Sequence, residues 1–421
     1  MKSSSVSIPK IEIIAVGSEL LSPFFKDTNS LYLIERLNDL GLEANFKTTV
    51  GDDWDDLKLA IQNSLIRANI VFIMGGLGPT DDDRTREALS SVLKRKLLFR
   101  EDVFEQIHKR FQHRGIPMPS VNKKQAYVIE GSELLNNRRG TAPGIWMETS
   151  SNIIAALPGP PTELKPMFDL CVWPKLLKDQ RIYSVRKILK ITGLTESKVE
   201  SLIKNDYPKD KELRLSTLAH PGQIEIHLLS QSQKDIAQAE QKIEALSSTL
   251  MDRLGENVFS SSGEDLEEIV GLLLRQRQKT VAAAESCTGG YLGHRLTNIS
   301  GSSDYFLMSL VAYHNDIKSS LLHVPQELLD KYGAVSSEVA SAMANGIRKR
   351  SSADYGLAIT GIAGPGGDTS DKPVGLVYTA LAGQNFTEVK KNLFLGDREM
   401  IKFQSSQRAL DMLRRYLLQS H

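Results

Sequence analysis

Two stretches of the chain, residues 11–157 and 264–418, alternate short apolar runs with amphipathic segments, and this alternation constrains the fold most strongly. The first stretch predicts strands at 11–17, 45–51, 70–74 and 153–157 and helices at 29–40 and 53–68. Strands that alternate with helices form parallel sheets with right-handed crossovers. The sequence therefore predicts the α/β class, with one α/β sandwich domain in each stretch.

The second stretch repeats this pattern after a segment of different character. It predicts strands at 280–284, 310–313 and 355–360, a hairpin of 374–382 with 389–394, and helices at 265–275, 291–298, across 315–350 and at 397–418. The predicted domains are residues 10–170, 171–255 and 256–421.

The middle segment predicts a small α+β unit. Its expected elements are strands at 184–191 and 223–229, a short helix at 196–205 and a long polar helix at 235–253. No Gly-x-x-Gly loop of the kind that clamps single-stranded nucleic acid lies between them. We interpret the unit as a spacer or a dimerisation module.

The composition excludes several classes of protein. The 421 residues carry 52 basic and 51 acidic side chains, a net charge of +1, so the charge balance calls for neither nucleic acid nor an acidic membrane. The sequence has two cysteines, Cys171 and Cys287, which are far apart in the chain and do not indicate a disulfide framework. This favours a reducing cytoplasm. No segment has the pattern of a signal peptide or a membrane span.

A candidate nucleophile follows the strand predicted at 280–284. Residues 283–290 read Ala-Ala-Glu-Ser-Cys-Thr-Gly-Gly and precede a predicted helix. Ser286 is the hydroxyl candidate, Cys287 is the rival nucleophile, and a helix N-cap is the structural alternative for Ser286. The N–H groups of Thr288, Gly289 and Gly290 are candidate donors to an oxyanion or a phosphate.

A serine needs a base before it can attack, and this chain offers histidines and a lysine. His294, His314 and His323 are the nearby histidines. Lys318 is the alternative, because a lysine in a dry pocket loses part of its preference for the charged form. The alternative is that Lys318 is a helical lysine exposed to solvent, with no part in catalysis. Tyr313 is either a proton relay beside it or a half-buried strand residue.

At these residues the chain resembles the C-terminal domain of the CinA family. The segments that carry the resemblance are Ala-Glu-Ser-Cys-Thr-Gly-Gly, Ile-Ser-Gly-Ser-Ser (299–303), Val-Ala-Tyr-His-Asn-Asp-Ile-Lys (311–318), Ala-Ile-Thr-Gly-Ile-Ala-Gly-Pro-Gly-Gly (358–367) and Val-Gly-Leu-Val-Tyr (374–378). The family includes nicotinamide mononucleotide deamidases. The resemblance thus implies a cofactor-independent amidohydrolase that converts nicotinamide mononucleotide to nicotinic acid mononucleotide and ammonia.

The resemblance also implies roles for individual residues. Ser286 would be the nucleophile, Lys318 its base and Tyr313 the assisting hydroxyl. Thr360 and Gly361 would line the substrate site, and Arg398 of the Gly-Asp-Arg segment would bind the phosphate through its planar donor fork.

The N-terminal stretch has a glycine loop followed by three carboxylates. Gly75, Gly76 and Gly78 precede Asp81-Asp82-Asp83 directly. Adjacent carboxylates repel one another, and a hard cation would relieve that repulsion while a pyrophosphate occupied the glycine loop. The alternative is an inert acidic helix start with Asp83 near the first helical position.

The wider N-terminal pattern resembles the molybdopterin-binding-like domain of the CinA family. The matching segments include Val16-Gly-Ser-Glu-Leu-Leu21, Asp27-Thr-Asn-Ser30, Val50-Gly-Asp-Asp53 and Leu157-Pro-Gly-Pro-Pro161. Some full-length members hydrolyse ADP-ribose to AMP and ribose 5-phosphate with a divalent metal or potassium. The resemblance therefore assigns Asp52, Asp82 and Asp83 to the metal or the pyrophosphate. Ser22-Pro23 departs from the family, which more often has a glycine there.

The sequence thus predicts a bifunctional, cytoplasmic, homodimeric enzyme of pyridine-nucleotide salvage that acts on nicotinamide mononucleotide and ADP-ribose. One alternative keeps the deamidase and makes the N-terminal domain a non-catalytic nucleotide sensor. Two others are an adaptor protein linked to competence or DNA damage and a handler of the molybdenum cofactor. No nucleic acid or membrane partner is expected.

Overall fold

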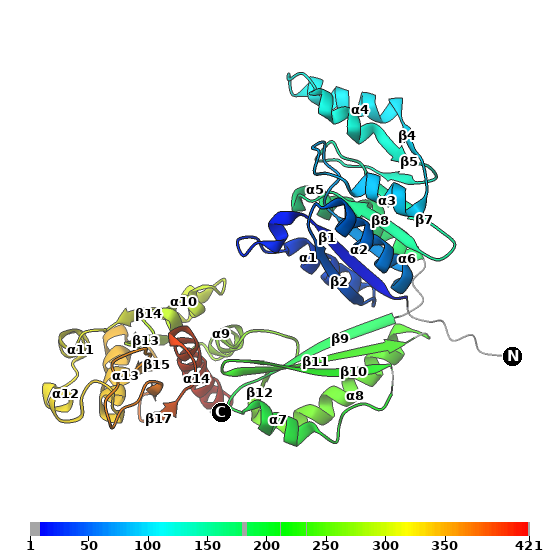
Figure 1. Cartoon of the computed structure of the whole chain (residues 1–421). Helices are drawn as coiled ribbons and strands as arrows, with labels where there is room; N and C mark the ends of the chain where they lie inside the picture. Colours follow the sequence, from blue (N-terminus) through cyan, green and yellow to red (C-terminus); the bar gives the residue numbers. More distant parts are fainter. Residues whose placement is uncertain (1–8, 179–182, 211, 233, 420–421) are drawn as a thin grey trace. The chain divides into compact units, whose positions relative to one another are not determined.

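The computed structural model describes residues 9–178, 183–210, 212–232 and 234–419. The chain divides into two compact units, Met1–Ser184 with Gln231–Ile236 and Val185–Ser230 with Ala237–His421. Each unit is an assembly of helices and sheets, as Figure 1 shows. No helix among the described residues is long and apolar enough to span a bilayer.

The first unit contains a six-stranded sheet with the order β2-β1-β3-β8-β7-β6. Its strands are β1 (Ile11–Val16), β2 (Ala44–Val50), β3 (Ile70–Met74), β6 (Glu133–Leu135), β7 (Gly144–Glu148) and β8 (Ile153–Leu157). The pairs β1–β2, β1–β3 and β3–β8 are parallel, whereas β7 and β6 complete the sheet antiparallel. The predicted parallel sheet with alternating helices is confirmed.

Helices cover both faces of this sheet, because its central strands are apolar on both sides. One face packs on α1 (Thr28–Asp39), α5 (Pro161–Met167) and α6 (Trp173–Lys178), and the other packs on α2 (Trp54–Arg67) and α3 (Thr85–Leu93). A small satellite cluster holds α4 (Glu101–His113) against the antiparallel pair of β4 (Leu97–Phe99) and β5 (Tyr127–Ile129).

The second unit begins with a small module built on a sheet of order β10-β11-β9-β12. Its elements are β9 (Tyr183–Ile191), α7 (Glu196–Ile203), β10 (Leu213–His220), β11 (Gln223–Ser232), α8 (Ile236–Leu254) and β12 (Val258–Ser260). The sequence analysis missed β10. Its apolar alternation is carried by Leu213 and Leu215 and then fades into small and polar residues, so antiparallel pairing with β11 determines its conformation.

The rest of the second unit is a three-layer α/β domain whose sheet has the order β14-β13-β15-β16-β17. Its strands are β13 (Val281–Glu285), β14 (Phe306–Val311), β15 (Tyr355–Gly361), β16 (Leu376–Ala382) and β17 (Thr387–Leu393). The predicted hairpin is confirmed, since β16 and β17 pair antiparallel. One face packs on α9 (Leu266–Gln276), α10 (Tyr291–Thr297) and α14 (Arg398–Gln419), and the other packs on α11 (Asn315–Leu322), α12 (Gln326–Tyr332) and α13 (Ser337–Ser351).

Candidate active site

The predicted site residues of the second unit lie where three parallel strands end. Strand β13 pairs with β14 through Glu285 and Val311 and with β15 through Glu285 and Ile359. The backbone continues this register, because Ser286 N donates to Ile359 O at 2.9 Å and Ala312 N donates to Glu285 O at 2.8 Å. The segments that begin at Ser286, Ala312 and Thr360 therefore leave the same edge of the sheet as neighbours.

This edge is a topological switch point. The chain leaves β13 through α10 on one face to reach β14, and it leaves β14 through helices on the opposite face to reach β15 on the other side of β13. Connections that diverge in this way open a crevice at the carboxyl ends of the strands, which is where α/β folds bind ligands. Ser286 follows the strand at the centre of this arrangement.

Ser286 does not cap a helix, which excludes the structural alternative. Helix α10 begins at Tyr291 and its N-cap is Gly290, four residues after Ser286. Ser286 lies in the turn between strand and helix, where its carbonyl accepts from Gly289 N at 3.1 Å. Its side chain is left available for chemistry.

Cys287 is buried in the hydrophobic core beside α9, α10 and α14. Burial away from water raises the pKa of the Cys287 thiol to about 12, and the charge of Glu285 adds to the effect. A thiol with this pKa stays protonated near neutral pH and is a poor nucleophile. Cys287 packs among the apolar core residues, so Ser286 stays the predicted nucleophile.

Lys318 is not exposed to solvent, as it would be in the alternative that makes it an ordinary helical lysine. It lies in the first turns of α11 with a relative exposure of 1%, and its Nζ donates to Tyr313 O at 2.9 Å. Burial lowers the pKa of the Lys318 ammonium. A buried amine with a lowered pKa is suited to accept a proton.

The two groups of the predicted dyad share this edge without a direct bond. Among the described residues, no hydrogen bond joins Ser286 Oγ to Lys318 Nζ, whose partner is the Tyr313 carbonyl. The charge of Lys318 acts to lower the pKa of Cys287, the residue next to Ser286, so the two side chains lie near each other. Catalytic hydrogen bonds are often long without substrate and tighten when it binds.

Tyr313 and Arg398 form the outer part of the site. Strand β14 ends at Val311, so Tyr313 is not a half-buried strand residue, and its relative exposure is 61%. Arg398, the first residue of α14, donates from Nη2 to Tyr313 Oη at 3.3 Å and from Nη1 to Gly364 O at 2.6 Å. The guanidinium therefore lies beside the exposed phenol, where an anionic group of a ligand would meet it.

The available backbone donors differ from the predicted set. Gly289 N is used by Ser286 O, and Gly290 N donates to Glu285 Oε2 at 3.1 Å. In the described part of the chain, the N–H groups of Cys287 and Thr288 donate to no backbone carbonyl. An N–H directly after a nucleophile is a common oxyanion donor in α/β hydrolases, so these two groups are the better candidates.

Two threonines of the site have contrasting side chains. The hydroxyl of Thr360 is fully buried and donates to Ala334 O at 2.8 Å, so it anchors β15 to a neighbouring loop. The Thr288 hydroxyl is fully buried and has no hydrogen-bond partner among the described residues. Gly361, the last residue of β15, packs so closely on Val377 that a side chain there would clash.

Glu285 holds this loop in place, and sequence reasoning missed it. The fully buried carboxylate accepts from the N–H groups of Gly290, Leu292 and Gly293 at 2.8–3.1 Å and from Ser309 Oγ at 2.9 Å. It thereby accepts hydrogen bonds from N–H groups in the first turn of α10 that have no acceptor within the helix. The helix dipole also favours a negative charge at this end. One sequence signal could have identified Glu285: an acidic residue ends an apolar strand and lies shortly before the start of a helix.

Replacing Glu285 by glutamine is expected to lower the free energy of unfolding by about 3 kcal/mol, because an amide group would face backbone donors that now bind a carboxylate. Urea denaturation followed by circular dichroism measures this loss. Glu399→Gln, the same change at an exposed position of α14, is the control and should shift the midpoint little. Equal midpoints for the two variants would contradict the role of Glu285.

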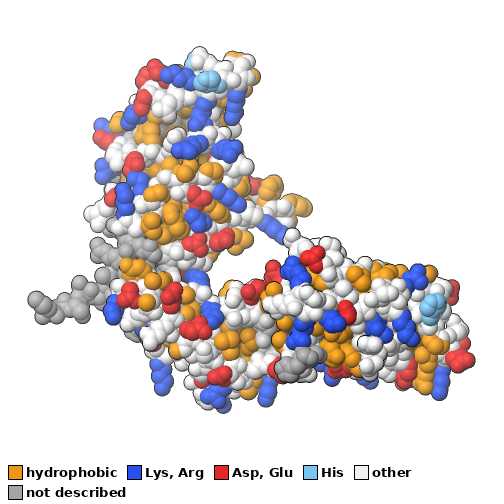
Figure 2. All heavy atoms as spheres, turned by 180° about the vertical axis from the view of Figure 1, so that it is seen from behind, with side chains coloured by type: hydrophobic (Ala, Val, Ile, Leu, Met, Phe, Trp, Pro, Cys, Tyr) orange, Lys and Arg blue, Asp and Glu red, His pale blue; other side chains and the backbone are white. Residues whose placement is uncertain are grey.

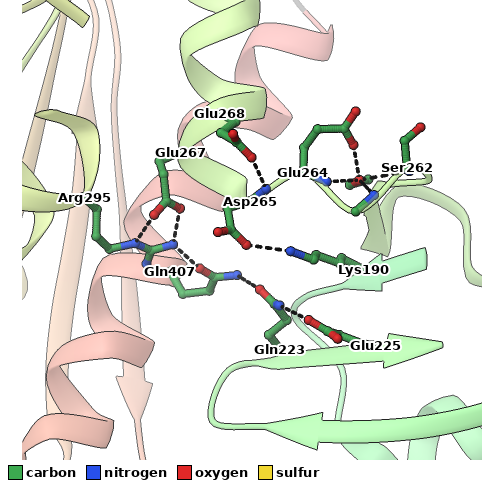
Figure 3. Close-up of polar contacts among 12 residues, drawn as sticks. Lys190, Gln223, Glu225, Ser262, Glu264, Asp265, Glu267, Glu268, Arg295 and Gln407 are labelled. Carbon is green, nitrogen blue, oxygen red and sulfur yellow. Dashed lines mark hydrogen bonds and ion pairs between the residues drawn. The ribbon is translucent and has the colours of Figure 1, made fainter. Parts of the chain in front are cut away.

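A polar network connects α9, α10 and α14 to the small module that contains β9 and β11, as Figure 3 shows. Arg295 of α10 is buried and donates to both carboxylate oxygens of Glu267 and to Gln407 Oε1 at 2.6–3.1 Å. Gln407 of α14 donates in turn to Gln223 of β11 at 3.2 Å. Lys190 of β9 pairs with Asp265 at 2.6 Å. The helix that follows the Ser286 turn is thus fixed by α9 and α14.

The first unit has a cleft of about 710 Å³ at the carboxyl edge of its own sheet. The loops after β1 and β3 meet there, and the connections from these strands again run over opposite faces. Gly75, Gly76 and Gly78 line the cleft, as the sequence analysis predicted for a ligand loop, together with Asp52, Asp82 and Asp83.

The carboxylates of this cleft do not form a ready-made metal centre. Asp52 Oδ2 accepts from Ser18 N at 2.9 Å, and Asp83 Oδ2 accepts from Thr80 N at 3.0 Å. Within the described ranges, no group of three or more His, Cys, Asp or Glu residues lies together as metal ligands do. The carboxylate donors have the chemistry that a hard cation requires, and the metal remains a prediction.

The acidic loop is fixed by two basic residues to which the sequence analysis gave no role. Arg86 of α3 is buried and donates to Leu77 O at 3.0 Å and to Lys124 O at 3.2 Å, while Lys124 Nζ donates to the carbonyls of Thr80 and Asp83. Helix α3 begins at Thr85, so Asp83 lies before the helix rather than near its first position.

Comparison with known proteins covers nearly the whole chain. The "Probable molybdopterin binding domain" matches residues 12–178, the "Damage-inducible protein CinA KH domain" matches residues 186–260, and the "CinA C-terminal domain" matches residues 263–417. The middle segment, interpreted above as a spacer or dimerisation module, thus matches a KH domain. Its three glycines, Gly193, Gly222 and Gly255, contain no Gly-x-x-Gly pair.

Several relatives match at full length. A CinA-like protein of Koribacter versatilis is 45% identical over 97% of this chain and 99% of its own length. A CinA-like protein of Acidobacterium capsulatum is 46% identical over the same shares. The crystal structure of competence/damage inducible protein CihA from Agrobacterium tumefaciens is 38% identical over 37% of this chain and 98% of its own, with a TM-score of 0.36. The chain belongs to the CinA family.

Proposed function

We propose that the second unit hydrolyses the carboxamide of nicotinamide mononucleotide to nicotinic acid mononucleotide and ammonia. The observation that carries the proposal is the burial of Lys318, whose amine has a lowered pKa, at the sheet edge that Ser286 follows. A serine with a lysine base is a known arrangement for acyl transfer. No cofactor is needed for this chemistry.

The proposed reaction has two steps. Ser286 Oγ bonds to the carboxamide carbon while neutral Lys318 takes the hydroxyl proton. The carbonyl oxygen becomes an oxyanion that the N–H groups of Cys287 and Thr288 would stabilise. The C–N bond then breaks, and Lys318 returns the proton to the leaving ammonia. In the second step water loses a proton to Lys318 and attacks the acyl ester. As the bond from the carbonyl carbon to Ser286 Oγ breaks, Lys318 returns that proton to Ser286 Oγ and the acid is released.

Arg398 and Tyr313 are proposed to bind the substrate. A guanidinium presents a planar fork of donors that matches a phosphate, and Tyr313 Oη lies within 3.3 Å of it. The direct test is to incubate the full-length protein with nicotinamide mononucleotide and to measure ammonia and nicotinic acid mononucleotide. Equimolar formation of both supports the proposal, and neither product forming would refute it.

We propose ADP-ribose hydrolysis, to AMP and ribose 5-phosphate, as the function of the first unit. The cleft with its glycine loop is the observation that favours it. Among the residues that the structure describes, the lining carries six carboxylates and one cation, Lys26. The carboxylates belong to Glu19, Asp27, Asp52, Asp82, Asp83 and Glu163. A pyrophosphate would be repelled unless a bound divalent metal or potassium ion neutralised this charge. Asp52, Asp82 and Asp83 are the proposed ligands.

Removal of metal is therefore expected to abolish AMP formation from ADP-ribose, and added Mg²⁺ is expected to restore it. Asp82→Asn should lower the rate at least about tenfold through weaker cation binding. Asp81→Asn is the matched control, because Asp81 is adjacent in sequence but does not line the cleft. Chromatography of the AMP formed measures both the effect of metal removal and the rates of the variants. Undiminished AMP formation in EDTA and potassium-free buffer would contradict the charge argument. Absence of AMP with every ion tested would instead favour the nucleotide-sensor alternative.

Two observations weigh against a nucleic-acid adaptor. The KH-like module lacks the Gly-x-x-Gly clamp. On the face drawn in Figure 2, basic and acidic side chains are interspersed rather than gathered by sign, in keeping with the net charge of +1.

A homodimer is proposed on the resemblance to the family, and light scattering of the full-length protein tests it.

A further inference from the structure

The loop between β1 and α1 can be followed in Figure 1. It carries large apolar side chains that are exposed, and part of it lines the cleft of the first unit. Phe24 has a relative exposure of 87% and Phe25 of 61%, and Leu21 of the same loop is also exposed. Adjacent exposed phenyl rings are uncommon on a monomeric surface and mark a place where a ligand or a partner binds. They lie in the segment where Ser22-Pro23 departs from the family pattern.

The two phenylalanines differ in their relation to the cleft. Phe25 lines it together with Lys26, whereas Phe24 is not among its lining residues. Phe25 is the single aromatic side chain among the described residues of that lining. The pair therefore offers one ring that faces the cleft and one neighbouring ring that does not.

The loop is fixed at both ends, so Phe25 has a defined place at the rim. At the start, Gly17 N donates to Val50 O at 3.0 Å and Ser18 N donates to Asp52 Oδ2 at 2.9 Å. At the end, Asp27 accepts from Ser30 N at 2.9 Å and pairs with Lys47 at 3.0 Å. Asp52 thus belongs both to the carboxylates of the cleft and to the anchor of this loop.

We infer that Phe25 stacks on the heteroaromatic base of a nucleotide whose phosphates lie at the glycine loop. Base stacking on an exposed aromatic ring is a general way to hold a nucleotide, because every base presents a flat π face. The side chain would then select phosphate esters that carry a base over those that do not. The inference rests on the nucleotide function proposed for the first unit, which it extends by naming the base-binding residue.

The test compares two ligands of the full-length protein by calorimetry in the presence of Mg²⁺. AMP carries a base, and ribose 5-phosphate carries the same sugar and phosphate chemistry without one. Phe25→Leu is expected to weaken AMP binding about tenfold, within the range of base–aromatic stacking, and to leave ribose 5-phosphate binding unchanged. Phe25→Tyr should bind AMP as the original protein does.

Phe24→Leu is the matched control, since it makes the same change on the next residue and should alter neither affinity. The inference is overturned if Phe25→Leu binds AMP normally, if it weakens both ligands equally, or if the original protein does not prefer AMP to ribose 5-phosphate. These outcomes are separable from failure of the proposed function, which is measured as AMP production from ADP-ribose. If both leucine variants instead lower the molecular mass in light scattering without affecting AMP binding, the rings form a contact between copies and the inference also fails.

Discussion

Ser286→Ala is expected to lower the rate of ammonia release from nicotinamide mononucleotide by at least about 10³-fold, because the nucleophile of a covalent mechanism has no substitute. The KM should change little, since the hydroxyl contributes to bond formation rather than to the proposed phosphate contact at Arg398. Steady-state assays of ammonia measure both constants. Binding of nicotinamide mononucleotide to the inactive variant, measured by calorimetry, shows whether the site remains intact.

Cys287→Ala is the control for this prediction. The thiol is buried in the core and its raised pKa keeps it protonated, so its loss should cost about 1–2 kcal/mol of stability and leave most of the activity. The reverse result, an active Ser286→Ala protein and an inactive but folded Cys287→Ala protein, would assign the nucleophile to the thiol.

Lys318→Met is expected to abolish activity to a similar degree, because methionine fills the same buried space without accepting a proton. Lys318→Arg should be equally inactive, since a guanidinium remains protonated. In the original protein kcat/KM should rise with pH as Lys318 loses its proton, with a midpoint below the ordinary lysine value of 10.5. A pH–rate profile without this rising limb would exclude Lys318 as the base.

The same lysine is expected to affect stability with a defined sign. The pKa of Lys318 is lower in the folded protein than in the unfolded chain, so between the two values the unfolded state binds more protons and stability increases with pH. Lys318→Met removes this dependence. Its gain in stability over the original protein should therefore be largest near neutral pH and shrink as the pH rises towards 10.5, which denaturation at several pH values measures. A constant difference across this range would show that the ammonium is not destabilised by burial.

The sequence predicted the strands and helices around Ser286 because local patterns define them. Apolar runs of five or six residues gave β3, β8 and β13 within a residue or so, and the strand–turn–helix order placed Ser286 at a strand end. Strand β10 was missed because its local sequence pattern does not define a strand. Its few apolar residues carry too weak a pattern, and its partner β11 supplies the remaining information.

The sequence by itself determined the order of the elements, the class of the fold and the positions of the reactive side chains along the chain, since these follow from local periodicity and chain order. Only the tertiary structure decided how far those side chains are buried and which hydrogen-bond partners they meet. Lys318 is buried on α11, Cys287 is buried against α9 and α14, and Glu285 binds the N–H group of Gly290 that the sequence analysis assigned to the substrate. Desolvation and hydrogen-bond occupancy depend on groups that are remote in sequence, so no local pattern encodes them.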